Sequence, residues 1–170
     1  LQAGRTDLPL VAMAKAAGTS DRMLVYYFKT REALLAEVAQ SIRLRRRRRL
    51  AQVMAAIPNS ETPAEGIRSV LGWVTAEENA ADIRLFYDTV VAGFHANEPF
   101  AAFAPGAVQD WVAESATAAR ACGAGDDEAV VFGTLLAATA QALAADRLST
   151  GDDDRIAACL APATDVLAGL

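Results

Sequence analysis

The sequence predicts an all-α fold. Apolar residues recur three and four positions apart along most of the 170 residues, as in Leu10, Met13, Ala14 and Ala17. Alanine and leucine form most of this background, and no stretch of alternating β-branched residues is long enough for a strand. Breaks containing glycine or proline separate the periodic stretches. We therefore expect helices joined by turns throughout.

Composition places the chain among ordinary globular proteins. Hydrophobic residues make up 53% of it and charged residues 22%. We find no apolar run of the roughly 18–20 residues that a transmembrane helix needs, and no signal-peptide pattern at the start. We therefore expect a cytoplasmic protein with no membrane partner.

The net charge of −5 hides an asymmetry along the chain. Residues 1–50 contain 11 Lys and Arg and 4 Asp and Glu, whereas residues 51–170 contain 5 and 17. A basic N-terminal segment on an acidic body indicates a head that binds a polyanion and a body that avoids nucleic acid.

The first helices surround a short turn. Residues 1–7 read as a loop, and Pro9 suits the first position of a helix ending near Ala17. Gly18 is a C-cap signal, and Thr19 or Ser20 can cap a helix over residues 20–27. Thr30 can cap a long helix that begins at Arg31 and continues until Pro58.

The remaining helices are expected at about 63–77, 80–95, 106–122, 126–147 and 152–169. The last two are the most apolar, which predicts burial on more than one side. Gly133, Ala137 and Ala140 would permit close helix approach. We expect these two helices to pair with those of a second copy, and an internal bundle core is the alternative.

Two helices around a short turn containing glycine form a helix-turn-helix pattern. The run Met13-Ala14-x-x-Ala17-Gly18-Thr19-Ser20-x-x-Met23-Leu24-x-Tyr26-Tyr27-Phe28-x-x-Arg31-Glu32-x-Leu34-Leu35 resembles the DNA-binding signature of TetR-type transcriptional regulators. The run spans 23 of the 170 residues and departs from the family at Met23, where threonine is typical, and at Val25, where tyrosine is typical. The resemblance also implies a first helix that is largely missing from the chain. In that family the last two long helices form the dimer interface, and an effector pocket lies in the middle helices.

The helix-turn-helix pattern and the resemblance predict a DNA-binding surface on the helix from Ser20. Arginine suits the O6 and N7 atoms of guanine, while tyrosine hydroxyls and helix N-terminal N–H groups suit phosphate oxygens. Asp21 would repel phosphate but could accept from cytosine N4. The alternative is a solvated helix start that binds nothing. The predicted DNA-binding residues are Thr19, Ser20, Asp21, Arg22, Met23, Val25, Tyr26, Tyr27, Thr30 and Arg31.

Nearly all large aromatics of the predicted body fall between residues 73 and 111. Aromatic walls with a few polar groups are typical of small-ligand sites, although core packing would explain most of these residues as well. The predicted ligand-binding residues are Trp73, Arg84, Phe86, Tyr87, Phe94, His95, Phe103, Trp111 and Gln141.

The arginine run at residues 45–49 has two interpretations. Arg45 follows Thr30 by 15 residues, or about 22 Å along a helix. We favour a solvated or salt-bridged linker over contact with flanking phosphates.

Other chemistry finds little support. His95 has no metal-ligand or triad partner at a suitable spacing, and no Gly-rich phosphate loop occurs. Asp152-Asp153-Asp154 lacks the spacing of a calcium loop and suits a helix start. Cys122 and Cys159 read as reduced thiols. We expect no metal, no cofactor and no enzymatic activity.

These inferences assign a helix-turn-helix DNA-binding domain to residues 1–47 and a ligand-binding and dimerisation domain to residues 48–170. We expect a homodimer that binds a palindromic double-stranded DNA operator and is released by an unidentified small-molecule effector. We favour a repressor, and an activator stays open. The rival is an all-α small-molecule carrier without DNA binding.

Overall fold

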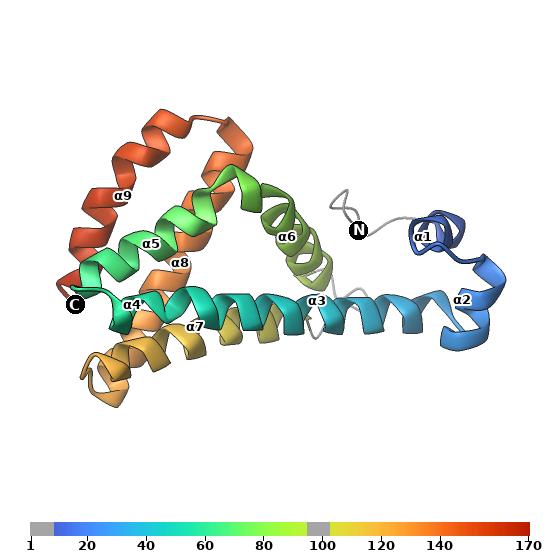
Figure 1. The fold of residues 1–170 in the computed structure, drawn as a ribbon, viewed down its shortest axis with the longest axis horizontal. Helices are drawn as coiled ribbons and strands as arrows, with labels where there is room; N and C mark the ends of the chain where they lie inside the picture. The colour runs from blue at the N-terminus through green and yellow to red at the C-terminus, as the bar shows by residue number, and fades with distance from the viewer. Residues whose placement is uncertain (1–8, 95–102) are drawn as a thin grey trace. The chain divides into compact units, whose positions relative to one another are not determined.

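A computed structural model describes residues 9–94 and 103–170. These residues form helices and connecting turns with no strand, which confirms the predicted all-α class for the part of the chain that is described (Figure 1). In chain order the helices are α1 (Leu10–Ala16), α2 (Asp21–Phe28), α3 (Arg31–Met54), α4 (Ala56–Asn59), α5 (Pro63–Thr75), the 3-10 turn η1 (Glu77–Asn79), α6 (Ala80–Phe94), α7 (Phe103–Ala121), α8 (Asp126–Thr150) and α9 (Asp153–Ala168).

The chain divides into two compact units, which are described separately below. Unit 1 comprises residues 1–45 and 84–107, and unit 2 comprises residues 46–83 and 108–170. The first boundary lies close to the predicted domain boundary at 47/48. Of the described residues, 84–94 and 103–107 belong to unit 1, whereas the sequence prediction assigned them to the second domain.

In unit 1, short polar residues set the turn between α1 and α2. The N–H groups of Gly18 and Thr19 donate to the carbonyl oxygens of Lys15 and Ala14 at 3.2 and 2.9 Å, and Gly18 has a φ of 67°. This is a Schellman C-cap, in which a residue with positive φ closes the helix. The Ser20 hydroxyl then accepts from the Met23 N–H at 3.2 Å and caps α2.

A small apolar cluster joins the first three helices. Ala14, Leu24 and Leu34 are buried together, with Leu10 and Phe28 packed against them. Leu24 and Phe28, four residues apart on one side of α2, therefore seat this helix on a core. The opposite side of α2 is left exposed.

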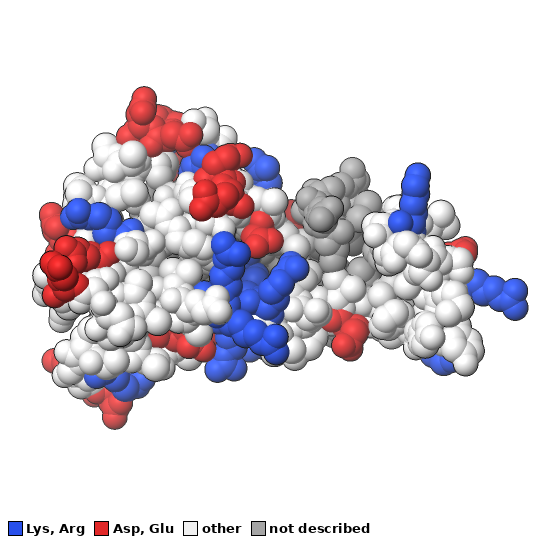
Figure 2. Space-filling model, in the orientation of Figure 1, with Lys and Arg blue, Asp and Glu red and all other residues white. Residues whose placement is uncertain are grey.

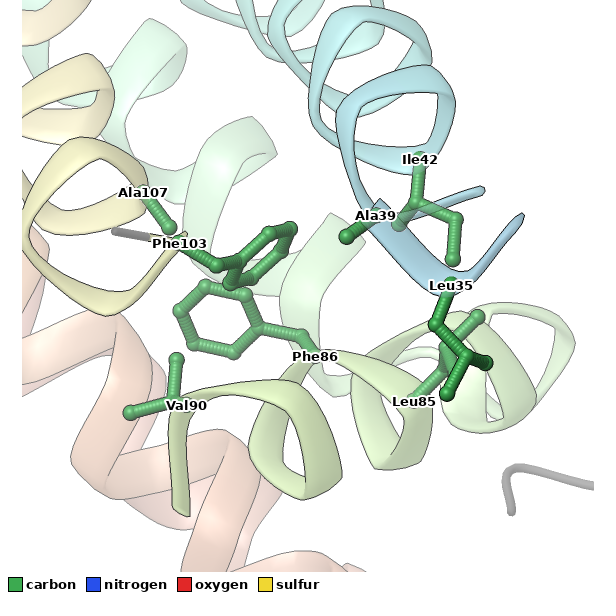
Figure 3. Packing of buried hydrophobic residues seen from close by; sticks show 8 residues of the cluster. All are labelled: Leu35, Ala39, Ile42, Leu85, Phe86, Val90, Phe103 and Ala107. Atoms are coloured by element: carbon green, nitrogen blue, oxygen red, sulfur yellow. The ribbon is translucent and has the colours of Figure 1, made fainter. Parts of the chain in front are cut away.

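A second cluster in unit 1 joins α3, α6 and the start of α7. Figure 3 shows the rings of Phe86 and Phe103 close together, with Leu35 and Ile42 reaching toward Leu85 from α3. Each of these side chains is at most about 6% exposed. Phe86 and Phe103 are therefore core residues of this unit.

In unit 2, α5 is the central helix and packs against α4, α8 and α9 (Figure 1). Its start is fixed by a capping box, because the Thr62 hydroxyl accepts from Glu65 N–H while the Glu65 carboxylate accepts from Thr62 N–H. A Cβ on Gly66 would lie 2.3 Å from the Ile57 Cα, so this glycine allows α4 and α5 to touch through their backbones.

The long helix predicted from Arg31 to Pro58 is interrupted. It ends at Met54, and a separate short helix, α4, contains Pro58. Proline has no N–H to donate to the carbonyl of Met54, so the continuous ladder cannot pass this point.

An ion-pair network fixes the corner between α8 and α9. The Arg155 guanidinium contacts Asp146 at 2.7 Å and Asp152 at 3.1 Å, and Arg147 contacts Glu77 at 2.9 Å and Asp153 at 2.8 Å. Hydrogen bonding to Arg155 lowers the pKa of Asp146 below its ordinary value. The Asp152 carboxylate also caps α9, as the interpretation of the three aspartates as a helix start requires.

The most buried side of α8 faces its own chain. Ala137 is 2% exposed, Ala140 is fully buried, and a Cβ on Gly133 would lie 2.7 Å from the Val112 carbonyl of α7. The expected close approach at these small residues therefore occurs within one chain. Ala137 cannot lie on a surface that meets a second copy.

The other side of α8 is apolar and exposed. By length and composition, α8 is long and apolar enough to cross a membrane, so the expectation that the chain contains no such run was wrong. Thr134, Thr139 and Gln141 interrupt the apolar residues and hid the run in the sequence. One such helix is weak evidence, since core helices of soluble proteins pass the same test; a third of its apolar window is buried.

Candidate nucleic-acid interface

Helix α2 presents an unusual set of exposed side chains. Leu24 is 8% exposed, whereas Tyr26 and Tyr27 are 65% and 67% exposed. Met23 and Val25 are also exposed, as are Asp21 and Arg22 at the start of the helix. Leu24 anchors α2 in the core, whereas the other apolar and aromatic side chains of this helix face solvent.

Asp21 makes a local hydrogen bond at the start of α2. Its carboxylate accepts from the N–H of Arg22 at 2.9 Å, so it folds back onto the first turn of the helix. A carboxylate at this end is favourable because the unpaired N–H groups carry partial positive charge. This bond engages one carboxylate oxygen of Asp21, and the contact that the carboxylate could make with cytosine N4 stays a prediction.

The end of α2 holds a cation beside the tyrosines. The Lys29 ammonium donates to the Tyr26 carbonyl at 2.7 Å and lies 5.0 Å from the centre of the Tyr26 ring. The rings of Tyr26 and Tyr27 meet edge to face with their centres 5.3 Å apart. Sequence analysis passed over Lys29, although a lysine directly before the Thr30 cap, at the end of an exposed aromatic pair, was a signal for it.

Lys29 also has a special backbone conformation. Its φ of 65° places a non-glycine residue in a region that L-residues rarely occupy. The chain turns here from α2 into α3, and the Thr30 hydroxyl accepts from Ala33 N–H at 3.1 Å to cap the new helix. The expected Thr30 cap is therefore confirmed.

Thr19, Ser20 and Thr30 are exposed near these helix starts, and Arg31 is half-buried. Figure 2 shows Lys and Arg side chains projecting from the surface over α1 and α2. The predicted DNA-binding residues thus lie on one helix and the two turns that flank it, in one unit. Hydroxyls, phenols, cations and helix N-termini occur together there, and these are the groups that contact phosphates and base edges.

Several members of the arginine run have partners within unit 2. Arg46 donates to the Asp82 carbonyl at 2.7 Å, and Arg47 pairs with Glu114 at 3.0 Å. Arg49 donates to Asn79 at 3.1 Å and lies 5.8 Å from the centre of a Trp73 ring. These contacts favour the linker interpretation for the three residues, because their charges are engaged by the body.

The predicted ligand-binding residues divide between the units. In unit 1, Phe86 and Phe103 are buried in the core, with Tyr87 packed against it, while Arg84 and Phe94 are exposed. In unit 2, Trp111 is buried and Trp73 and Gln141 are half-buried. His95 lies outside the described residues.

Among the predicted ligand-binding residues, Trp73 and Trp111 have the features of a ligand site. Trp73 and Trp111 have ring centres 6.5 Å apart. The indole nitrogen of Trp73 is buried and has no hydrogen-bond partner among the residues that the structure describes. A buried unpartnered N–H costs roughly 1–3 kcal/mol, so an acceptor beside it would be favourable.

No group of His, Cys, Asp and Glu in the described residues could hold a metal ion. Cys122 and Cys159 are not paired with each other. Comparison of the chain with protein-family models, curated proteins and solved structures finds no match.

Proposed function

We propose that the protein is a ligand-responsive transcriptional regulator that binds a double-stranded DNA operator through α2. The observation that carries the proposal is the surface of this helix, where Tyr26 and Tyr27 are about two-thirds exposed while Leu24 anchors the helix. An exposed aromatic pair is costly to leave in water and is typical of a contact surface. The resemblance of this stretch to TetR-type regulators gives the same function.

The polar groups of the surface suit DNA. Arg22 lies in the first turn of α2, from which side chains of a recognition helix reach base edges in the major groove. The tyrosine hydroxyls, Lys29 and the N-terminus of α3 suit phosphates. Residues 9–45 contain six Lys and Arg and three Asp and Glu, and this excess of positive charge supplies the long-range attraction that such a contact needs.

A two-fold dimer would place two such surfaces on a palindromic site. The exposed side of α8 supports this, because Val131, Leu135, Ala138 and Ala142 follow one another at helical spacing and all are exposed. The exposed residues of α9 include Ala161, Pro162 and Val166. An apolar stripe of this length suits a partner helix better than water.

The Trp73–Trp111 pair is our proposed place of effector contact. Its unpartnered indole N–H favours an effector that carries a hydrogen-bond acceptor beside an apolar or aromatic group. Effector binding in the body would then weaken the fit of two DNA-binding surfaces on one operator.

The test is selection of binding sites from random duplex DNA with the full chain, followed by titration of the enriched site at several salt concentrations. We expect an enriched palindromic sequence and an affinity that falls steeply with salt. The double variant Tyr26→Ala, Tyr27→Ala should lose the site. A matched double alanine substitution at Val108 and Gln109, both exposed on α7, should leave binding of the site unchanged.

The rival function, a small-molecule carrier, makes the opposite prediction. A carrier would enrich no sequence and would show no salt-dependent retention on nonspecific duplex DNA. That result would end the regulator proposal.

A further inference from the structure

Unit 2 contains a cavity that the proposed function does not use. It has a volume of about 230 Å³ and lies where the short α4, the start of α5, the end of α7, the start of α8 and the end of α9 meet. Figure 1 shows the end of α9 beside α4 and the start of α5. Neither tryptophan of the Trp73–Trp111 pair lines it.

The walls of the cavity are mainly aliphatic and aromatic. Ile57, Ile67, Phe132 and Leu167 form them, while Cys122 and Glu128 supply a thiol and a carboxylate. The Glu128 carboxylate already accepts from the Gly125 N–H at 3.1 Å, so it serves the start of α8. The cavity therefore offers apolar contact and little unused polar chemistry.

The surrounding backbone is held in place before any ligand arrives. Gly66 lets α4 and α5 touch, and the capping box of Thr62 and Glu65 fixes the start of α5. The turn that carries Cys122 is bridged by an ion pair of 2.6 Å between Arg120 and Asp126. A preformed apolar cavity binds without a large ordering cost, which is the usual property of small-molecule sites.

We propose that this cavity is a binding site for a small apolar molecule of one or two rings. A closed cavity of about 150 Å³ lined by Leu, Ile and Phe is enough to take up benzene. The present one is larger and is partly open to solvent. It is too small for a helix of a second copy, so the proposal commits to a small-molecule occupant. It does not depend on DNA binding.

The two cysteines make the proposal testable, because Cys122 lines the cavity and Cys159 does not. In the Cys159→Ser chain, toluene is titrated by calorimetry and the rate of Cys122 alkylation by iodoacetamide is measured alongside. When the toluene concentration equals its dissociation constant, the rate should fall about twofold, as mass action requires. In the Cys122→Ser chain, toluene should leave the alkylation of Cys159 unchanged.

A filling variant separates the cavity from general effects on the surface. Ala119 lines the cavity, so Ala119→Leu should place its added carbons there, remove toluene binding and abolish the protection of Cys122. The matched change Ala113→Leu, at an exposed position of α7 that does not line the cavity, should leave both intact. Alkylation of Cys122 that ignores toluene would overturn the proposal, as would protection that survives Ala119→Leu in a folded chain. If the rate of Cys122 alkylation falls as the protein concentration rises but does not change with toluene, a second copy covers the cavity. That result would also overturn the proposal.

Discussion

Gly66 and Gly72 lie in the same helix and have opposite surroundings. A Cβ on Gly66 would approach the Ile57 backbone to 2.3 Å, whereas nothing lies within 4 Å of the corresponding position on Gly72. Backbone atoms of a packed helix cannot move aside as a flexible side chain can. The pair therefore separates the effect of added volume from the effect of helix propensity.

We predict that Gly66→Ala destabilises the protein by about 1–3 kcal/mol, the usual cost of overpacking. Gly72→Ala should stabilise it by roughly 0.5–1 kcal/mol, because glycine in a helix interior is less favourable than alanine. Urea denaturation followed by circular dichroism measures both. Equal stabilities for the two variants would show that α4 and α5 can separate at little cost.

The second residue-scale prediction concerns Arg22 and Arg31, and it rests on the proposed DNA binding. Arg22→Ala should reduce affinity by roughly 1–3 kcal/mol and relax preference at one base position, as loss of a guanine contact does. Arg31→Ala should weaken all sequences alike and flatten the slope of log K against log salt by about 0.9 per lost contact.

Operator variants titrated at several salt concentrations measure this difference. Tyr27→Phe should resemble Arg31→Ala with a smaller loss and little change of slope, since it removes no charge. Arg68→Ala, an exposed arginine of α5, is the control. If Arg22→Ala weakens every sequence equally, Arg22 contacts the backbone and does not read a base.

At the scale of elements, helix ends were the part of the fold that the sequence predicted best. Gly18, Thr30 and Asp152 act within a few residues of their own positions, so local chemistry determines these helix ends. The start of α7 was placed three residues late, at 106 and not at Phe103. Pro105 was taken as part of a break, although a proline in the first turn of a helix loses no hydrogen bond.

The corner between α8 and α9 predicts a dependence of stability on pH. The pKa of Asp146 is lowered in the folded chain, chiefly by its hydrogen bonds to Arg155. Its contribution to stability is therefore present above the ordinary value of 3.8 and is lost as the pH falls through the lowered folded value.

Asp146→Asn should thus be less stable than the parent chain at pH 6, with a difference that shrinks below pH 4 or so. Urea denaturation across this range measures the difference. Asp165→Asn, at an exposed position of α9, is the matched control. If Asp146→Asn lowers the free energy of unfolding by the same amount at every pH tested, the ion pair with Arg155 is not the cause of the destabilisation.

At the scale of the whole molecule, the sequence identified which helices are apolar but not what covers each side of them. Residues 84–107 were expected in the second domain, yet Phe86 and Phe103 are buried against α3 in unit 1. Periodicity shows that a side is apolar, whereas the partner of that side depends on contacts between residues distant in sequence. The predicted ligand-binding residues are likewise divided between the two units, and their assignment to one pocket stays a prediction.

Helix α8 raises the same question for the dimer. Its small residues Gly133, Ala137 and Ala140 looked like an intermolecular contact and instead meet α7 or the body of their own chain. The exposed residues on the other side of α8 are the ones that could contact a second copy. Leu135 is 42% exposed and Val131 is 54% exposed, and both lie on this side.

We therefore predict that Leu135→Arg produces monomers whose helical content and thermal unfolding resemble those of the parent chain. A charge placed in an apolar contact between copies would be buried without a partner in the dimer but solvated in the monomer. Ala137→Arg should instead unfold the chain, because its side chain would enter the core. Sedimentation velocity over a range of concentrations, with Ala113→Arg on the exposed side of α7 as the control, distinguishes these outcomes. A Leu135→Arg chain that stays dimeric would place the contact between copies on another surface, and a parent chain that is soluble only in detergent would assign the exposed side of α8 to lipid.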